Sequence, residues 1–279
     1  MYDGASPSDP ARLQRASGEI RIGVRPRDGA TVLADLRQAG CLKARFPRPT
    51  VPGWIDVVTL NTGGGVAGGD RLDIAVTAEA GARAVVAAQA AERFYRAAAS
   101  DVPSSVRTRL TVQDGAALEW LPQETILFDR CALDRRLEID VADGARFLCI
   151  ETLVFGRIAM GETVRQAMLR DVIRVRRGGS LLLHDAIRLD GAVDAVMQRT
   201  AVAAGARVVA TVLLVAPEAE ALLESVRDAV AGTEAGVSAW NGMLVARLLG
   251  ADSAAVRRTV VQALAVLRPS RPLPRVWLC

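Results

Sequence analysis

The feature that most constrains the fold is a short glycine turn that recurs between segments of alternating polarity. Every second residue is apolar at 72–77 and again at 137–142, which is typical of strands with one polar face. Similar turns, each with a glycine beside a small residue, lie at 79–82, 113–116, 142–145 and 177–180. Their first glycines are 34, 29 and 34 residues apart, and residues 27–30 form an earlier turn of the same kind.

These turns predict reversals of the chain, because glycine accepts the positive φ that hairpin turns need. Their repeat at about thirty residues predicts similar two-strand units stacked on one another, as in a solenoid-like body. An antiparallel sandwich with frequent hairpins fits the pattern equally well. Aromatic residues make up 4% of the chain, so the core of either architecture must be built from small side chains.

Helical periodicity replaces alternation in the last third of the chain. Residues 217–231 and 251–267 predict two helices, with a strand at 243–249 between them and an extended proline-rich tail at 269–277. We therefore expect a mainly β (α+β) fold with two C-terminal helices. No linker divides residues 18–279, which we expect to form a single domain after a flexible tail at residues 1–17.

Composition and charge exclude several classes of function. The 35 basic and 31 acidic residues are spread along the chain, without the basic run of a nucleic-acid interface. The four cysteines are too far apart in sequence for a structural zinc site, and we expect reduced thiols. Residues 1–17 lack the apolar segment of a secretory signal, and no apolar stretch spans a bilayer. These features predict a cytoplasmic protein that binds neither nucleic acid nor membrane.

The most glycine-rich segment is 62–70. It satisfies the dinucleotide-binding pattern G-x-G-x-x-G, but that pattern needs a helix next, and residues 71–77 predict a strand. No Lys-Ser/Thr pair follows, so a phosphate-cradling loop is excluded as well. We assign the segment to backbone geometry, at positive φ or close backbone approach, which concerns Gly63, Gly64, Gly65, Gly68 and Gly69.

No set of side chains identifies a catalytic site. His184 is the single histidine, and no serine near it has the glycine elbow of a nucleophile. Carboxylates near aromatic residues could act as acids, bases or metal ligands, or could hold turns by hydrogen bonds. The sequence alone does not show which of these carboxylates lie close together in the fold. The seven carboxylates are Asp70, Glu92, Glu119, Glu124, Asp129, Glu151 and Glu162.

Four longer motifs follow one another at residues 60–72, 89–96, 118–129 and 155–162, and Arg275-Val276-Trp277 follows them near the end of the sequence. In order and spacing they resemble the motifs of the urease accessory protein family UreD, also called UreH. The resemblance covers residues 18–279. Two departures are mild: Val66-Ala67 within the glycine segment, and Met160 where a polar or charged residue is common.

The resemblance implies a β-helix-like stack of strand layers and a maturation factor that is not an enzyme. Members of this family act as scaffolds on apo-urease, with its subunits UreA, UreB and UreC, together with UreF and the GTPase UreG. Nickel and CO2 then build the active centre. The resemblance also implies transient Ni2+ in an internal water-filled passage, with no tightly bound cofactor. Carboxylates in the matching motifs become the candidates for that passage: Asp70, Glu92, Glu124, Asp129 and Glu162.

Two other classes of function stay open. A hydrolase or transferase could use the carboxylates around Glu124 and Asp129, and a generic β-scaffold could bind proteins without any role for a metal. An apolar β body that normally rests on partners exposes strand edges. We therefore expect poor solubility of the isolated chain and rescue by co-expression with UreF.

Overall fold

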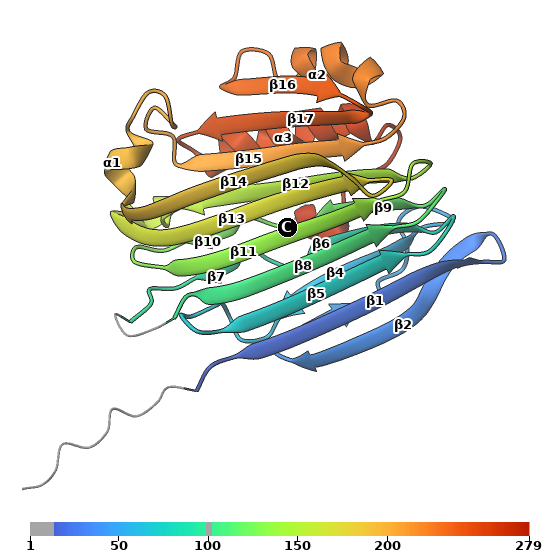
Figure 1. Ribbon diagram of the computed structural model, residues 1–279, viewed down its shortest axis with the longest axis horizontal. Coiled ribbons are helices and arrows are strands. Elements are labelled where there is room, and N and C mark those ends of the chain that lie inside the picture. The colour runs from blue at the N-terminus through green and yellow to red at the C-terminus, as the bar shows by residue number, and fades with distance from the viewer. Residues whose placement is uncertain (1–13, 99–101, 279) are drawn as a thin grey trace, which may run out of the picture.

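The computed structural model describes residues 14–98 and 102–278, which form two facing β-sheets with helices beside one of them (Figure 1). The seven-stranded sheet has the order β14 (Ser180–Ala192), β13 (Gln166–Arg177), β11 (Ala132–Val141), β8 (Ser104–Val112), β5 (Arg71–Ala78), β1 (Ser17–Arg27) and β2 (Ala30–Gly40). The ten-stranded sheet has the order β16 (Ala235–Trp240), β17 (Met243–Gly250), β15 (Val208–Val215), β12 (Arg146–Phe155), β9 (Ala117–Leu121), β6 (Arg83–Ala88), β4 (Ile55–Asn61) and β3 (Leu42–Arg45). Off this path, β10 (Thr125–Leu127) pairs with β12, and β7 (Glu92–Phe94) pairs with β10. The mainly β prediction is confirmed.

Successive strand-turn-strand units stack in parallel. In the seven-stranded sheet β5, β8, β11 and β13 pair in parallel, and in the ten-stranded sheet β6, β9 and β12 do the same. Antiparallel pairs flank this stack, for example β1 with β2, β13 with β14, and β12 with β15. The thirty-residue repeat therefore marks stacked two-strand units, and the alternative of an ordinary antiparallel sandwich is wrong.

The hairpin prediction is wrong for three of the five glycine turns. The turns at Gly81, Gly115 and Gly144 join β5 to β6, β8 to β9 and β11 to β12, so each carries the chain from one sheet to the other. These turns stack as the strands do, since the N–H of Gly81 donates to the carbonyl of Asp114 at 3.0 Å. The turns at 28–29 and 178–179 close true hairpins, because their flanking strands pair with each other. Turn chemistry fixes the reversal, whereas stacking neighbours decide which sheet receives the next strand.

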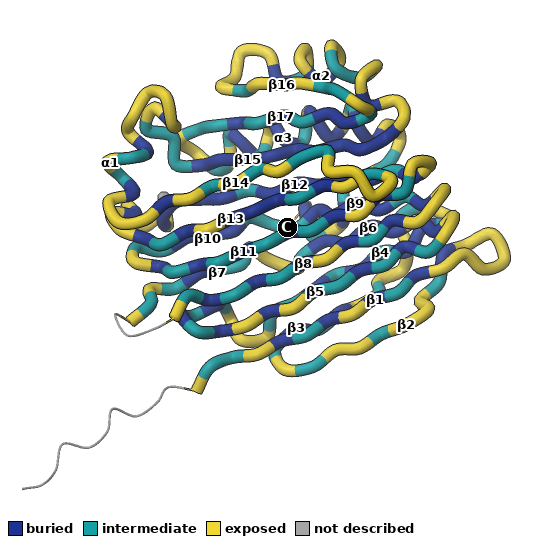
Figure 2. Tube along the Cα trace, viewed as in Figure 1, coloured by how far each residue is buried: buried dark blue, intermediate teal, exposed yellow. Residues whose placement is uncertain are grey.

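Apolar side chains, mostly aliphatic, form the core between the sheets. Inward residues such as Ile20, Val76, Leu110 and Ile139 are almost completely buried, and Figure 2 shows the burial as dark segments along the central strands. A second core lies on the other face of the ten-stranded sheet, under the C-terminal helices. Every residue of β15 is buried because both of its faces are covered. That double burial explains its continuous apolar sequence.

The two C-terminal helices are confirmed, with one change of boundary. α3 (Ser253–Leu267) begins where Asp252 caps it by accepting a hydrogen bond from the N–H of Ala255 at 2.8 Å. The first helix is shorter than predicted, because a turn at 216–219 and the 3-10 turn η2 (Glu220–Leu222) precede α2 (Leu223–Ala229). The structure adds α1 (Val193–Met197) and the 3-10 turns η1 (Ile158–Met160) and η3 (Arg275–Trp277), of which η3 interrupts the tail predicted as extended.

The start of the chain joins the fold earlier than the predicted tail boundary. Residues 1–13 lie outside the described residues. The N–H of Ala16 donates to the carboxylate of Asp70 at 2.7 Å, and Ser17 is the first residue of β1. Residues 16–17 are thus part of the sheet body.

Candidate functional site: a cavity between the sheets

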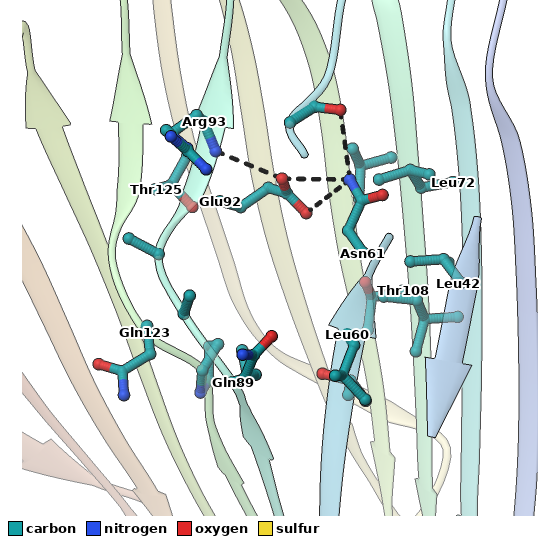
Figure 3. Close-up of a pocket in the computed structure, with 18 of the residues that line it drawn as sticks. Leu42, Leu60, Asn61, Leu72, Gln89, Glu92, Arg93, Thr108, Gln123 and Thr125 are labelled. Atoms are coloured by element: carbon teal, nitrogen blue, oxygen red, sulfur yellow. Dashed lines mark hydrogen bonds between the residues drawn. The ribbon is translucent and has the colours of Figure 1, made fainter. Parts of the chain in front are cut away.

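A cavity of about 320 Å³ lies between the two sheets. Its walls come from β5, β8 and β11 on one side and from β4, β6, β7, β9 and β10 on the other. Figure 3 shows the polar side chains around it, with Asn61 and Glu92 facing each other and Gln89 and Gln123 further along the wall. Most of the remaining lining is apolar, as in cavities that hold or pass small ligands.

The cavity forms where the ten-stranded sheet splits. Pairing of β4 with β6 stops at Thr59, and after residues 89–91 the chain continues as β7, which pairs with β10. The side chain of Asn61 spans the resulting gap, and its Nδ2 donates to the two carboxylate oxygens of Glu92 at 3.1 and 3.2 Å (Figure 3). A neutral amide therefore holds a carboxylate at the cavity wall.

Glu92 is held in an unusual environment for a carboxylate. Burial raises its pKa, against the opposing effects of the Asn61 and Arg93 N–H hydrogen bonds and of the Arg93 charge. No described lysine or arginine forms an ion pair with it within 4 Å. Its negative charge is consequently not consumed by a fixed cation of the protein.

A buried ion cluster forms another part of the cavity wall. The guanidinium of Arg135 donates to both oxygens of Asp171 at 2.8 and 2.6 Å, to Glu151 at 2.6 Å and to Thr125 at 3.1 Å. The indole of Trp120 donates to the other oxygen of Glu151 at 2.9 Å. Burial opposes the charge of Arg135, but the two carboxylates raise its pKa. Burial also raises the pKa of Glu151, and Arg135 limits that rise.

A second cavity of about 10 Å³, room for roughly one water molecule, continues past this cluster. Arg135 and Glu151 line both cavities, and Asp185 and Thr211 line the second one. Asp185 in turn forms an ion pair with Arg247 of β17. Charged and polar groups thus continue through the interior from Glu92 to the edge strand β14.

The five carboxylates proposed from the motifs do not gather at one place. Glu92 lines the cavity, and the other four lie outside its lining. Glu124 forms an ion pair with Arg257 of α3 at 2.8 Å. Within the described ranges, no three His, Cys, Asp or Glu side chains come together as a metal site.

The remaining three carboxylates hold loops through backbone hydrogen bonds. Asp70 accepts from the N–H groups of residues 16 and 67 at 2.7 and 2.8 Å. Asp129 accepts from two successive N–H groups at the start of β13, at 2.8 and 3.0 Å. Glu162 accepts from the N–H and the Nε of Arg157 at 3.2 and 2.8 Å. Burial raises the pKa of Glu162, but these hydrogen bonds bring it below its ordinary value. Asp129 thus holds the start of β13, whereas Glu124 pairs with Arg257 of α3, so these two carboxylates are not a pair that shares one site.

The glycine segment packs against this part of the chain. The backbone is left-handed at three of its glycines, with φ of +75°, +139° and +83° at Gly64, Gly65 and Gly69, while Gly63 and Gly68 do not have positive φ. A Cβ on Gly65 would overlap the ring of Tyr95, whose hydroxyl donates to the carbonyl of Gly64 at 2.6 Å. The strand β5 follows directly, where a dinucleotide site would need a helix.

Sequence reasoning missed Arg135 and Asp171 and did not select Glu151. The first two do carry a signal, because each stands at an inward position of an alternating strand where an apolar residue is expected. His184 is exposed on β14 and accepts a hydrogen bond from Nε of Arg174 at 3.2 Å. Free thiols are present at the described cysteines, Cys41, Cys131 and Cys149.

Comparison with known proteins decides the family. A family model described as UreD urease accessory protein matches residues 16–278. The chain belongs to this family. It is 46% identical over 268 residues to the urease accessory protein UreD of Azorhizobium caulinodans, which covers 95% of this chain and 97% of that protein. It is 47% identical over 268 residues to UreD of Dinoroseobacter shibae, with 95% and 93% covered, and 46% identical over 275 residues to UreD of Xanthobacter autotrophicus, with 98% and 93% covered.

The UreD assignment joins the cavity to the motifs that carried the resemblance. Asn61, Gly64, Gly65, Glu92 and Trp120 all line the cavity, and they come from three of the four motifs. None of the described helices is both long and apolar enough to cross a membrane.

Proposed function

We propose that this UreD chain is a urease maturation factor without catalytic activity, which binds apo-urease together with UreF and UreG and assists nickel insertion. UreA, UreB and UreC are the urease subunits that it meets, in the cytoplasm. Nickel is a transient cargo in this proposal. Membership of the urease accessory family supports the role, and the cavity supports the mechanism.

The observation that carries the mechanism is the unpaired carboxylate of Glu92 on the cavity wall. A passage for a divalent cation must attract the ion and also release it, which favours few carboxylate and water ligands over a closed ligand cage. Glu92 offers one carboxylate, and its hydrogen-bond partner Asn61 is neutral. A cation that enters the cavity can therefore interact with the carboxylate of Glu92 without first breaking an ion pair with a lysine or arginine.

The Arg135 cluster limits the routes by which the ion can leave. The guanidinium forms ion pairs with Glu151 and Asp171 and lines both the large cavity and the small one. A divalent cation that moves toward Asp185 must pass this positive charge, which repels it strongly in a low-dielectric interior. The proposed passage thus has an accepting part at Glu92 and a constricted part at Arg135.

The test uses Glu92→Gln, which removes the charge and keeps an oxygen that can accept from Asn61. Glu138→Gln, on the outer face of the seven-stranded sheet, is the matched control. Each variant is co-expressed with urease and the other accessory proteins, and we measure co-purified subunits, urease nickel content and urease activity. We expect an intact complex with less nickel for Glu92→Gln, and wild-type loading for the control. Wild-type loading by Glu92→Gln contradicts the passage, and failure of wild type to bring down urease subunits contradicts the whole proposal.

A further inference from the structure

Four loops meet at one end of the strands, at the left of Figure 1. We call this surface the loop end and define it as residues 62–66, 93–97, 128–131 and 156–166. The loops are tied together by side chains: the ring of Tyr95 meets that of Phe128 edge to face at 5.1 Å, and the guanidinium of Arg157 lies 4.5 Å above the Phe128 ring. Main-chain hydrogen bonds add to this, such as Ala97 N–H to the Arg130 carbonyl at 2.9 Å. The loop end is therefore a pre-organised surface.

The loop end presents positive charge. Five of its arginines are exposed: Arg93, Arg96, Arg130, Arg157 and Arg165. The carboxylates of the same loops, Asp129 and Glu162, accept from backbone N–H groups, and they also form ion pairs with Arg130 at 3.8 Å and with Arg157 at 2.8 Å. No described carboxylate forms an ion pair with Arg96 or Arg165 within 4 Å. The surface is thus complementary to a partner that carries carboxylates.

Met160 stands at the tip of the longest of these loops. Met160 is 73% exposed, as is Leu278 near the C-terminus, and no other large apolar residue in the described part of the chain is more exposed. Met160 lies in the 3-10 turn η1, beside exposed Ala159 and Gly161. An exposed, flexible apolar side chain on a surface that also carries exposed charges is typical of an anchor that enters a partner's pocket.

The geometry points to the loop end as the docking surface for apo-urease, which then presents an apolar socket for Met160 ringed by carboxylates. The inference rests on the proposed function. We choose apo-urease as the partner because of where the loop end lies: Gly64, Gly65 and Arg93 belong both to the loop end and to the cavity lining. A protein that receives an ion from the cavity has to dock beside it. Carboxylates of the docked partner would also neutralise arginines that otherwise repel a divalent cation.

A protein partner fits this surface better than a nucleic acid. Nucleic-acid bases stack on aromatic faces that are free. Here the guanidinium of Arg157 lies over the Phe128 ring, and Tyr95 packs edge to face against the same ring. The most prominent apolar group is an aliphatic side chain, which a protein pocket accommodates.

The test measures binding of purified apo-urease to the full chain in complex with UreF. Two variants change the loop end, Met160→Asp and the double variant Arg96→Glu with Arg165→Glu. Two matched controls make the same kinds of change elsewhere: Leu181→Asp on β14, where Leu181 is 52% exposed, and Arg83→Glu, an exposed arginine at the opposite end of the strands. Circular dichroism and retained UreF binding establish that each variant is folded.

We expect at least a tenfold loss of apo-urease affinity for both loop-end variants, less than a twofold loss for the controls, and a weaker salt dependence for the double arginine variant. Wild-type affinity in both loop-end variants overturns the inference and leaves the proposed function standing. Loss of UreF binding with unchanged apo-urease binding also overturns it, as does wild-type affinity for a 20-base-pair DNA duplex equal to that for apo-urease. No binding of wild type to apo-urease overturns the proposed function together with the inference.

Discussion

Replacing Arg135 by methionine tests how the protein tolerates charge between its two sheets. The guanidinium makes four hydrogen bonds to Asp171, Glu151 and Thr125, and all of these side chains are buried. Methionine fills much of the same space without charge. Arg135→Met therefore leaves two buried carboxylates without their cation.

The expected magnitude follows from this loss. Breaking a buried ion pair by removing one partner costs about 3–5 kcal/mol, because the other charge stays buried. For a chain of this size, 1 kcal/mol shifts the melting temperature by roughly 2–4 °C, so the variant should melt roughly 6–20 °C below wild type. The matched control is Arg107→Met on the outer sheet face, where Arg107 pairs with Asp134 at 2.9 Å and both side chains are about one-quarter exposed. A partly exposed ion pair on a sheet surface contributes about 0–1 kcal/mol, well below the buried pair.

The assay is thermal unfolding followed by circular dichroism, with all variants purified behind the same solubility tag. Loss of Arg135 raises the pKa of Glu151 further above its value in the unfolded chain, beyond the rise that burial already causes. A raised folded-state pKa gives stability below the unfolded value that is lost as pH increases. The destabilisation by Arg135→Met should therefore grow from pH 5 to pH 8. A melting temperature within 2 °C of Arg107→Met at pH 8 would refute the reasoning.

Three further predictions concern the cavity, the glycine segment and the sheet edges. Burial raises the pKa of Glu92, so ionisation of this carboxyl in the folded protein costs stability as pH increases. In the same unfolding assay, Glu92→Gln should therefore gain stability relative to wild type from pH 4 to pH 8. A constant difference in stability across this range contradicts the argument. Gly65→Ala should destabilise the protein by more than about 1 kcal/mol, and by more than Gly64→Ala, because both glycines have positive φ but a Cβ at residue 65 also meets Tyr95. Neither variant should alter any nucleotide affinity. Wild-type stability of both variants would contradict this prediction. The chain expressed alone should be poorly soluble, because β14 and β2 are edge strands that expose Leu181 and Leu33. Co-expression with UreF should raise the soluble yield. Equal yields with and without UreF count against this prediction.

Stacking of the strand units could be predicted from the sequence, but the identity of each turn could not. The intervals between Gly81, Gly115 and Gly144 reflect parallel units of nearly constant length, and that periodicity is visible in the residues. Whether a Gly turn closes a hairpin or crosses to the facing sheet depends on which strand lies next to it in space. The same local chemistry thus gives a crossing at Gly115 and a hairpin at Gly29.

The site was predictable in part, for a similar reason. Glu92 was selected from its motif, and it does line the cavity. Asp70 and Asp129 share that motif origin, but their oxygens accept backbone hydrogen bonds, which no sequence pattern distinguishes from a free carboxylate. Arg135 and Asp171 come from neighbouring strands 36 positions apart, and their pairing is set by the register of β11 against β13.

The central claim, that nickel reaches urease through the cavity between the sheets, is tested most directly by filling that cavity. Thr108 of β8 is buried and faces the cavity, whereas Thr111 of the same strand faces outward. Urease is assembled with Thr108→Phe, with Thr111→Phe or with the wild-type chain, and its nickel is measured by mass spectrometry after the complex is shown to be intact. The account predicts a large loss of nickel with Thr108→Phe and wild-type nickel with Thr111→Phe. Full nickel loading with Thr108→Phe would contradict the account.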